Sequence, residues 1–161
     1  MGWTDYFVLL GFIVVCVVAA SSGAMFQPGA WYKSLKKPWW NPPDWVFPVV
    51  WTVLYAFMAI AGWLVWRSAG SFGAAALPLG LFAVQLVLNA LWSAIFFGMK
   101  RMDWALIEVG LLWAAVLGCI VTFLPFSTTA AWLMAPYLLW VTIAAYLNYT
   151  VLRLNRDAVT A

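Results

Sequence analysis

Residues 109–152 read VGLLWAAVLGCIVTFLPFSTTAAWLMAPYLLWVTIAAYLNYTVL and contain no charged side chain. A helix crosses the hydrocarbon core of a bilayer with about 20 residues at roughly 1.5 Å per residue, so this stretch is too long for a single crossing. Pro125 and the polar run Ser127, Thr128 and Thr129 interrupt it near its middle. We therefore predict two transmembrane helices joined by a tight turn.

The rest of the chain repeats this pattern. Only 8% of the residues are charged and 67% are hydrophobic, and the charges fall in clusters between long apolar runs. A β-barrel would need short alternating segments, which these continuous runs are not. We predict an all-α fold: an integral membrane bundle of five transmembrane helices with a short helical first loop, forming one domain over residues 1–161. The expected spans are about 6–26, 45–66, 77–98, 104–124 and 130–152, with the first loop at 27–44.

Basic residues predict the orientation. With five alternating spans, Arg67 is the only Lys or Arg on one side of the membrane. The positive-inside rule places the first loop and the C-terminus in the cytoplasm and the N-terminus on the opposite side. A cleaved signal peptide is disfavoured because no basic residue precedes the first apolar run. The residues that share the predicted cytoplasmic side are Lys33, Lys36, Lys37, Lys100, Arg101, Arg153 and Arg156.

Several kinds of chemistry are excluded or disfavoured. The chain has no His, which removes the usual general base and the usual zinc and haem ligand, so we predict no metal site and no acid–base catalytic site. Cys16 and Cys119 lie inside spans and are interpreted as small packing residues. Glu108 is the one Asp, Glu, Lys or Arg well inside a span; with Asp103 it is interpreted as a complement to the helix start rather than as an ion-transport residue.

The first loop is the segment with the strongest functional signal. It continues into the second span as WYKSLKKPWWNPPDWVFPVVW, Trp31–Trp51. We predict that 30–37 forms a short amphipathic lid helix, that the prolines stiffen the loop, and that Asp44 caps the next helix. Aromatic faces beside lysines suit a flat, amphipathic, partly anionic ligand, and no nucleic-acid partner is expected.

Depth along the predicted helices places a pocket beneath this loop. At helical rise, Trp51 and Trp92 lie roughly 9 Å below the basic surface, Asn89 roughly 14 Å and Trp140 about 20 Å. Most other tryptophans fall near span ends, where an interfacial belt explains them. Trp51, Trp92, Trp113 and Trp140 are deeper, where an indole N–H needs a partner. Plain core packing remains the alternative to a ligand site.

Four segments resemble the tryptophan-rich sensory protein and translocator protein family, also called peripheral-type benzodiazepine receptor homologues. They are WYKSLKKPWWNPP, VFPVVWTVLY at 46–55, LNALWSAIFFG at 88–98 and PYLLWVTIAAYLNYTVLRLN at 136–155. Their order matches the family and they extend over all five spans. The resemblance implies a five-helix membrane bundle, often a homodimer, with a pocket opening towards the first loop.

The resemblance also implies ligands and site residues. Family members bind porphyrins such as protoporphyrin IX and haem, and isoquinoline carboxamides; animal members carry a cholesterol-recognition pattern in the last helix. That sterol pattern corresponds to Leu147, Tyr149 and Arg153. The implied pocket residues are Tyr32, Pro42, Trp51, Tyr55, Asn89, Trp92, Ser93, Trp140 and Ala144.

The implied role is that of a membrane receptor regulating tetrapyrrole metabolism or stress responses. Some members degrade protoporphyrin in light, and tryptophans matching Trp51 and Trp140 are implicated. No cofactor is required, and without His we expect the porphyrin ring rather than an iron atom to be recognised. A facilitative transporter of porphyrin or sterol is the alternative, and an interaction protein is another. For an interface, the small-residue stripes are Ala90, Ala94 and Gly98, and Gly110, Ala114 and Gly118.

Overall fold

A computed structural model describes residues 2–156, and this part of the chain contains helices and no strand. The elements are α1 (Trp3–Met25), α2 (Ala30–Ser34), α3 (Val46–Ala69), α4 (Ala76–Ser93), a π-helical turn η1 (Ala94–Gly98), α5 (Met102–Phe123) and α6 (Thr128–Leu154). Five helices are long and apolar enough to cross a membrane: α1, α3, α4 together with η1, α5 and α6. The predicted all-α, five-helix fold is therefore confirmed.

Local sequence explains where the helices begin and end. The break predicted in the longest apolar stretch is present, and the Ser127 hydroxyl caps α6 by accepting a hydrogen bond from the Ala130 amide at 3.2 Å. Gly70 ends α3 with φ of 76°, a left-handed conformation that glycine adopts without steric cost. At the start of α1, the Gly2 amide donates to the Asp5 carboxylate at 2.9 Å.

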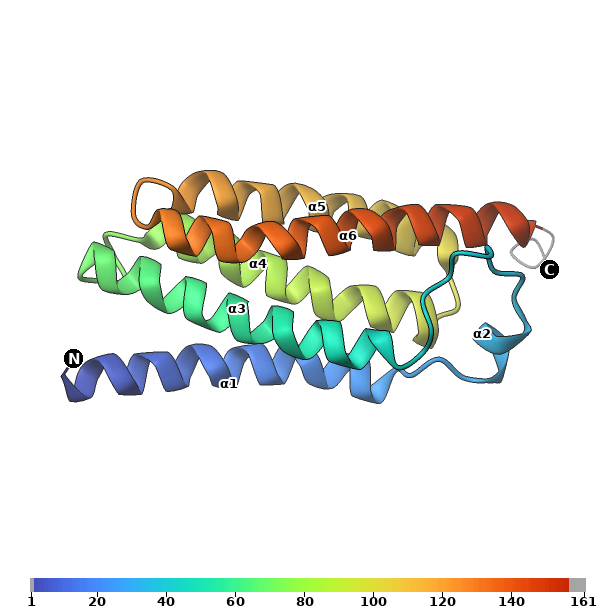
Figure 1. Cartoon of the computed structure of the whole chain (residues 1–161), viewed down its shortest axis with the longest axis horizontal. Coiled ribbons are helices and arrows are strands. Elements are labelled where there is room, and N and C mark those ends of the chain that lie inside the picture. The colour runs from blue at the N-terminus through green and yellow to red at the C-terminus, as the bar shows by residue number, and fades with distance from the viewer. Residues whose placement is uncertain (1, 157–161) are drawn as a thin grey trace.

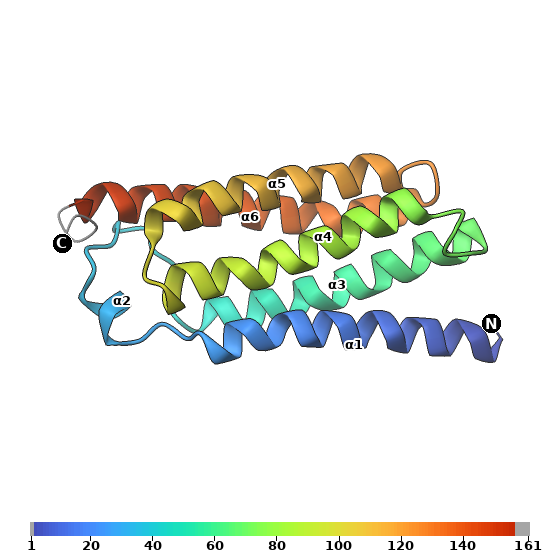
Figure 2. The same ribbon diagram turned by 180° about the vertical axis from the view of Figure 1, so that it is seen from behind.

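The five long helices run side by side and form a closed ring. The most extensive helix contacts follow the order α1, α3, α6, α5, α4 and back to α1, and α3 also touches α4. The N-terminus lies at one end of the bundle, and α2 and the C-terminal end of α6 lie at the other (Figures 1 and 2). The loop that contains α2 therefore covers the same end as the η1–α5 connection. We call this the first-loop end.

The lid helix is shorter than the sequence predicted. We expected it to continue to Lys37, but α2 ends at Ser34 and Leu35 is already extended, with φ of −69° and ψ of 145°. Two interactions explain the early end. Pro38 disfavours helical backbone at Lys37, and the side-chain amide of Asn155 pairs with the backbone of Lys36, accepting from its N–H and donating to its carbonyl, each at 2.9 Å.

An apolar core fills the opposite half of the ring. Met58, Phe123, Met134 and Tyr137 are fully buried there, and the two cysteines, also buried, are packing residues as predicted. Outward-facing positions on all five long helices are mostly large and apolar, as a lipid-facing surface requires.

Candidate functional site

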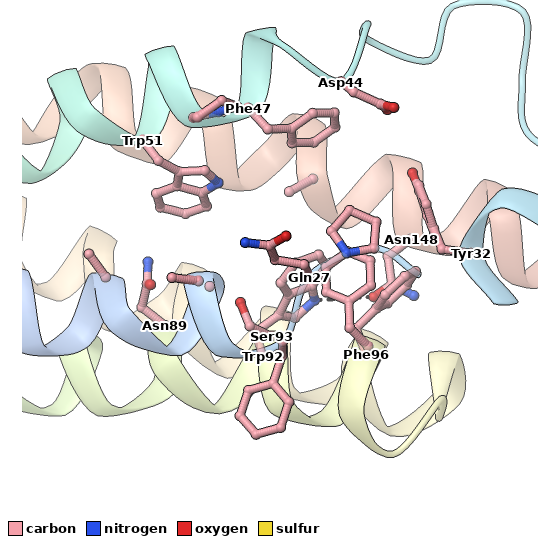
Figure 3. A pocket seen from close by; sticks show the side chains of 18 of the residues that line it. Gln27, Tyr32, Asp44, Phe47, Trp51, Asn89, Trp92, Ser93, Phe96 and Asn148 are labelled. Carbon is pink, nitrogen blue, oxygen red and sulfur yellow. Dashed lines mark hydrogen bonds between the residues drawn. The ribbon is translucent and has the colours of Figure 1, made fainter. Parts of the chain in front are cut away.

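A cavity of about 520 Å³ lies between α1, α3, the α4–η1 segment and α6, beneath the first loop (Figure 3). Its size is in the range of small-molecule and cofactor sites, and its walls are mainly apolar and aromatic, as is usual for them. The lining residues fall on few helical faces because they recur at steps of three or four. In α3 these are Phe47, Trp51 and Tyr55; in α6 they are Ala144, Leu147, Asn148 and Val151.

Small residues on α1 leave the space that the aromatic walls enclose. Ala20, Gly23 and Ala24 face the cavity where α1 passes α4. The two helices are joined at this level by a hydrogen bond of 2.6 Å, which the Ser22 hydroxyl donates to the carbonyl of Ala90. Larger side chains on this face of α1 would fill the cavity.

The deep end of the cavity is closed by a hydrogen-bonded chain. The Tyr55 hydroxyl donates to Oδ1 of Asn89 at 2.5 Å, and Nδ2 of Asn89 donates to the hydroxyl of Tyr137 at 2.7 Å. Trp51 lies against both tyrosine rings, with centroid distances of 5.7 Å to Tyr55 and 6.1 Å to Tyr137. The Trp51 side chain points into the cavity opposite Asn89 (Figure 3). The Asn89 amide and the two tyrosine hydroxyls are thus satisfied by one another.

A second amide fixes the aromatic wall formed by α4 and η1. The Trp92 indole N–H donates to Oδ1 of Asn148 at 3.2 Å, while Nδ2 of Asn148 donates to the carbonyl of Met102 at 2.9 Å. The Trp92 ring stacks on Phe96 at a centroid distance of 5.0 Å. Asn148 therefore holds the indole ring in one orientation and connects α6, α4 and the start of α5.

The lid residue Tyr32 closes the first-loop end. Its side chain is buried, its ring packs edge-on against Phe96 at 6.0 Å and Phe97 at 5.4 Å, and its hydroxyl lies 3.4 Å from Oδ1 of Asn41. Burial raises the pKa of the Tyr32 phenol to about 12, and the nearby Asp44 carboxylate adds to this effect. The hydroxyl is consequently a neutral donor at ordinary pH.

The structure brings most of the predicted pocket residues together. Tyr32, Trp51, Tyr55, Asn89, Trp92, Ser93 and Ala144 all line the cavity. Pro42 and Trp140 are not among its lining residues. Trp140 lies behind the wall, with its ring 5.8 Å from that of Phe47, and its assignment to the site stays a prediction.

Other lining residues were missed by the sequence reasoning. Asp44 was predicted to cap α3, but that prediction is wrong: the N-cap is Trp45, it has no side-chain hydrogen bond, and Asp44 lines the cavity instead. Gln27 and Phe47 also line it, and their side chains point inward in Figure 3. A usable signal existed for Phe47, because it lies one helical turn before Trp51.

Two deep tryptophans have the hydrogen-bond partners that their depth required. Besides Trp92, Trp113 donates to the Thr142 hydroxyl at 2.9 Å. Trp113 nevertheless faces outwards, with 37% of its surface exposed, so its predicted interior position is wrong. A short hydroxyl on the neighbouring helix satisfies the indole at the bundle surface.

Glu108 does not complement a helix end, contrary to the sequence interpretation. It is buried in α5, 6% exposed, and neither carboxyl oxygen has a hydrogen-bond partner within residues 2–156. Asp103 does lie in the first turn of α5, where its carboxylate forms an ion pair of 2.6 Å with Arg101. The Glu108 side chain points into the ring of helices because of its position on α5, whereas the Asp103 side chain points to the surface.

The residues of the sterol pattern are divided between inside and outside. Leu147 lines the cavity, whereas Tyr149 is 42% exposed and its hydroxyl accepts a hydrogen bond from Arg153 at 3.3 Å. No single surface of α6 presents all three side chains. A sterol-binding role for them stays a prediction.

The arrangement of five helices and an aromatic cavity under a proline-rich loop agrees with comparisons to known proteins. The model of the TspO/MBR family matches residues 12–154. This chain belongs to the TspO/MBR family. It is 44% identical over 151 residues to the tryptophan-rich sensory protein of Cereibacter sphaeroides, covering 94% of this chain and 93% of that protein.

Other TspO/MBR relatives match at similar lengths. The protein CrtK of Rhodobacter capsulatus is 43% identical, covering 89% of this chain and 90% of the relative. The human translocator protein is 40% identical, covering 91% and 89%. Because it belongs to the TspO/MBR family and has five apolar helices, this chain is a multi-pass membrane protein with a sensor or translocator role.

Proposed function

We propose that the cavity is a receptor site for porphyrins such as protoporphyrin IX, and that its occupancy regulates tetrapyrrole metabolism or a stress response. The observation that carries the proposal is the cavity itself: an aromatic chamber of about 520 Å³ with Trp51 and Trp92 on facing walls. A porphyrin has a large apolar face that suits indole and phenyl rings. Its polar edge would remain at the first-loop end, nearest to water.

The ring rather than a metal is the expected recognition element. Within residues 2–156 no group of three His, Cys, Asp or Glu side chains could hold a metal ion, and the chain has no His. Haem iron would therefore lack its commonest axial ligand. We expect protoporphyrin IX and haem to bind with similar affinity, and a large affinity gain from iron would contradict this.

Light-dependent degradation of bound porphyrin is part of the proposal. Trp51 lines the cavity, as Trp92 does on the facing wall, while Trp140 lies behind Phe47. The test is quenching of tryptophan fluorescence by protoporphyrin IX in the dark, followed by pigment loss under illumination, in wild type and Trp51→Phe. The variant is expected to bind within about threefold of wild type, because an aromatic face is kept, but to lose most of the bleaching.

A control variant separates the site from general tryptophan photochemistry. Trp104→Phe removes an exposed surface indole at the same end of the bundle, and it should bind and bleach like wild type. Unchanged bleaching in Trp51→Phe would refute the photochemical role of Trp51. An absence of saturable quenching in wild type would refute porphyrin binding.

Facilitative transport is the second candidate, favoured by the name of the translocator protein relatives. The packing favours a receptor. The cavity ends at the Tyr55–Asn89–Tyr137 chain, and the half of the bundle beyond this chain is filled by side chains that include the buried Met58 and Met134. Porphyrin flux into proteoliposomes distinguishes the two. A receptor retains ligand without flux, whereas steady flux would favour the transporter.

A further inference from the structure

The charge of the cavity differs from that of the surface above it. Asp44 is the one charged residue among the described residues that line the cavity; all other lining side chains are neutral. The carboxylate lies at the first-loop end, above Phe47 and on the same side as the Tyr32 hydroxyl (Figure 3). A ligand that enters beneath the lid must therefore place one edge next to a negative charge.

Asp44 has no counter-ion in the part of the chain that the structure describes. The ion pair found there joins Arg101 to Asp103, and no lysine nitrogen lies within 4.0 Å of Asp44. Lys37 extends to the mouth, but its ammonium group is 4.6 Å from the centre of the Tyr32 ring and donates to the carbonyls of Leu35 and Lys33 at 3.2 and 3.4 Å. The ammonium group of Lys37, which lies beside the ring of the cavity-lining Tyr32, is thus held by the loop itself.

The deep end of the cavity offers no cation to a ligand. Asn89 is hydrogen-bonded to two tyrosine hydroxyls, and Asn148 is bonded to Trp92 and to the backbone of Met102. Burying a carboxylate against these satisfied, neutral groups would be costly. A charged edge of a flat ligand must therefore stay at the mouth, within the influence of Asp44.

We propose that Asp44 is a specificity-determining residue, and that the site prefers a flat apolar ligand whose outer edge carries a hydrogen-bond donor or a cation over one that carries carboxylates. This rests on the proposed porphyrin site and specifies the chemistry of the ligand edge. The lysine-rich surface attracts anions to the loop, but the exposed Asp44 carboxylate at the mouth, which forms no ion pair among residues 2–156, selects at the last step. The loop surface consequently favours anionic ligands, whereas the mouth of the cavity favours a cation or a hydrogen-bond donor.

Three porphyrins with the same ring and different edges test this. They are protoporphyrin IX, a dianion; its dimethyl ester, which is neutral; and its bis(2-aminoethyl)amide, a dication. Their dissociation constants are measured by fluorescence quenching for wild type and Asp44→Asn, each in nanodiscs of zwitterionic lipid. In the variant, affinity for the dication should fall about three- to fivefold, affinity for the dianion should rise by a similar factor, and affinity for the ester should stay unchanged, as for a partly exposed charge pair.

A matched control excludes an effect of overall charge. Asp5→Asn makes the same chemical change at the opposite end of the bundle, and it should leave all three affinities unaltered. Equal shifts for the three porphyrins in Asp44→Asn, or none, would overturn the role of Asp44 while leaving porphyrin binding intact. If none of the three binds wild type, the proposed porphyrin site fails, and the inference about Asp44 fails with it.

Discussion

The two halves of this bundle use small residues in opposite ways. At the first-loop end, Ala20, Gly23 and Ala24 of α1 leave a cavity between the helices. In the other half, Gly62 of α3 receives the Phe12 ring of the same helix α1: a Cβ placed at Gly62 would lie 2.6 Å from that ring. Helix α1 therefore lines the cavity with small residues along one half of its length and packs closely against α3 along the other half.

Polar groups follow the same division. In the cavity half they form chains between helices, such as Tyr55–Asn89–Tyr137. In the packed half, apolar rings pack directly against one another, such as Phe12 against Phe82 at 5.6 Å. We therefore expect the packed half to supply stability and the open half to supply the proposed binding site, and four substitutions test this expectation.

The largest effect is expected in the packed half. Gly62→Val should destabilise the protein by about 1–3 kcal/mol, because the new side chain must displace the Phe12 ring. Thermal unfolding in nanodiscs measures this, and porphyrin affinity of the folded fraction should not change. Gly80→Val is the control, since Gly80 has nothing within 4 Å of a Cβ; an equal loss of stability there would contradict the explanation.

The next effect is at the boundary between the halves. Asn89→Leu leaves the hydroxyls of Tyr55 and Tyr137 without their partner, and the free energy of unfolding should fall by about 1–3 kcal/mol. The same substitution in a Tyr55→Phe background should cost less, because one of the orphaned hydroxyls is already gone. Strict additivity of the two changes would show that the chain of hydrogen bonds is not a unit.

A binding effect is expected in the open half. Trp51→Ala should weaken protoporphyrin binding roughly tenfold, since it removes an aromatic face worth about 1–1.5 kcal/mol, and should change stability less than Gly62→Val does. Trp104→Ala, on the exposed surface of α5, serves as the control in the same quenching titration. If both variants bind alike, the cavity is not where the porphyrin lies.

The smallest effect concerns the lid. Asn155→Ala removes both hydrogen bonds to the Lys36 backbone, each worth about 0.5–1.5 kcal/mol, so the first loop should open more often. Cleavage by trypsin after Lys33 and Lys36 should accelerate a few-fold, without a change in melting temperature. Thr150→Ala, on the exposed face of the same helix, should leave the cleavage rate as it is; equal rates in all three proteins would contradict the role of Asn155.

The positions of the helices were predicted from the sequence more accurately than the surroundings of individual side chains. Charge gaps gave five spans, and the turn around Pro125 and Ser127 was identified because a break was needed on length alone. Periodicity along single helices also placed Trp51, Asn89 and Trp92 at compatible depths, and the structure has all three on the cavity wall. These inferences succeeded because they depend on spacing within one helix.

The errors concern how helices are rotated and how the loop is placed. Glu108 and Asp103 are five residues apart in one helix, yet one is buried and the other forms a surface ion pair. Asp44 faces the cavity rather than capping α3 because the turn at Trp45 directs it there. Nothing in the linear pattern separates such positions, since both readings satisfy the same local rules.

The amino-acid sequence on its own determined that the chain has five membrane-spanning segments and collects most of its basic residues at one end, because hydrophobic length and charge gaps are properties of consecutive residues. Tertiary structure decided which half of the ring is open, which tryptophans face inwards, and that a carboxylate without a counter-ion lines the mouth of the cavity. Those features depend on the contacts of α1 with α3 and α4 and of the first loop with α6. Such contacts join residues far apart in the chain, so they follow from packing rather than from local pattern.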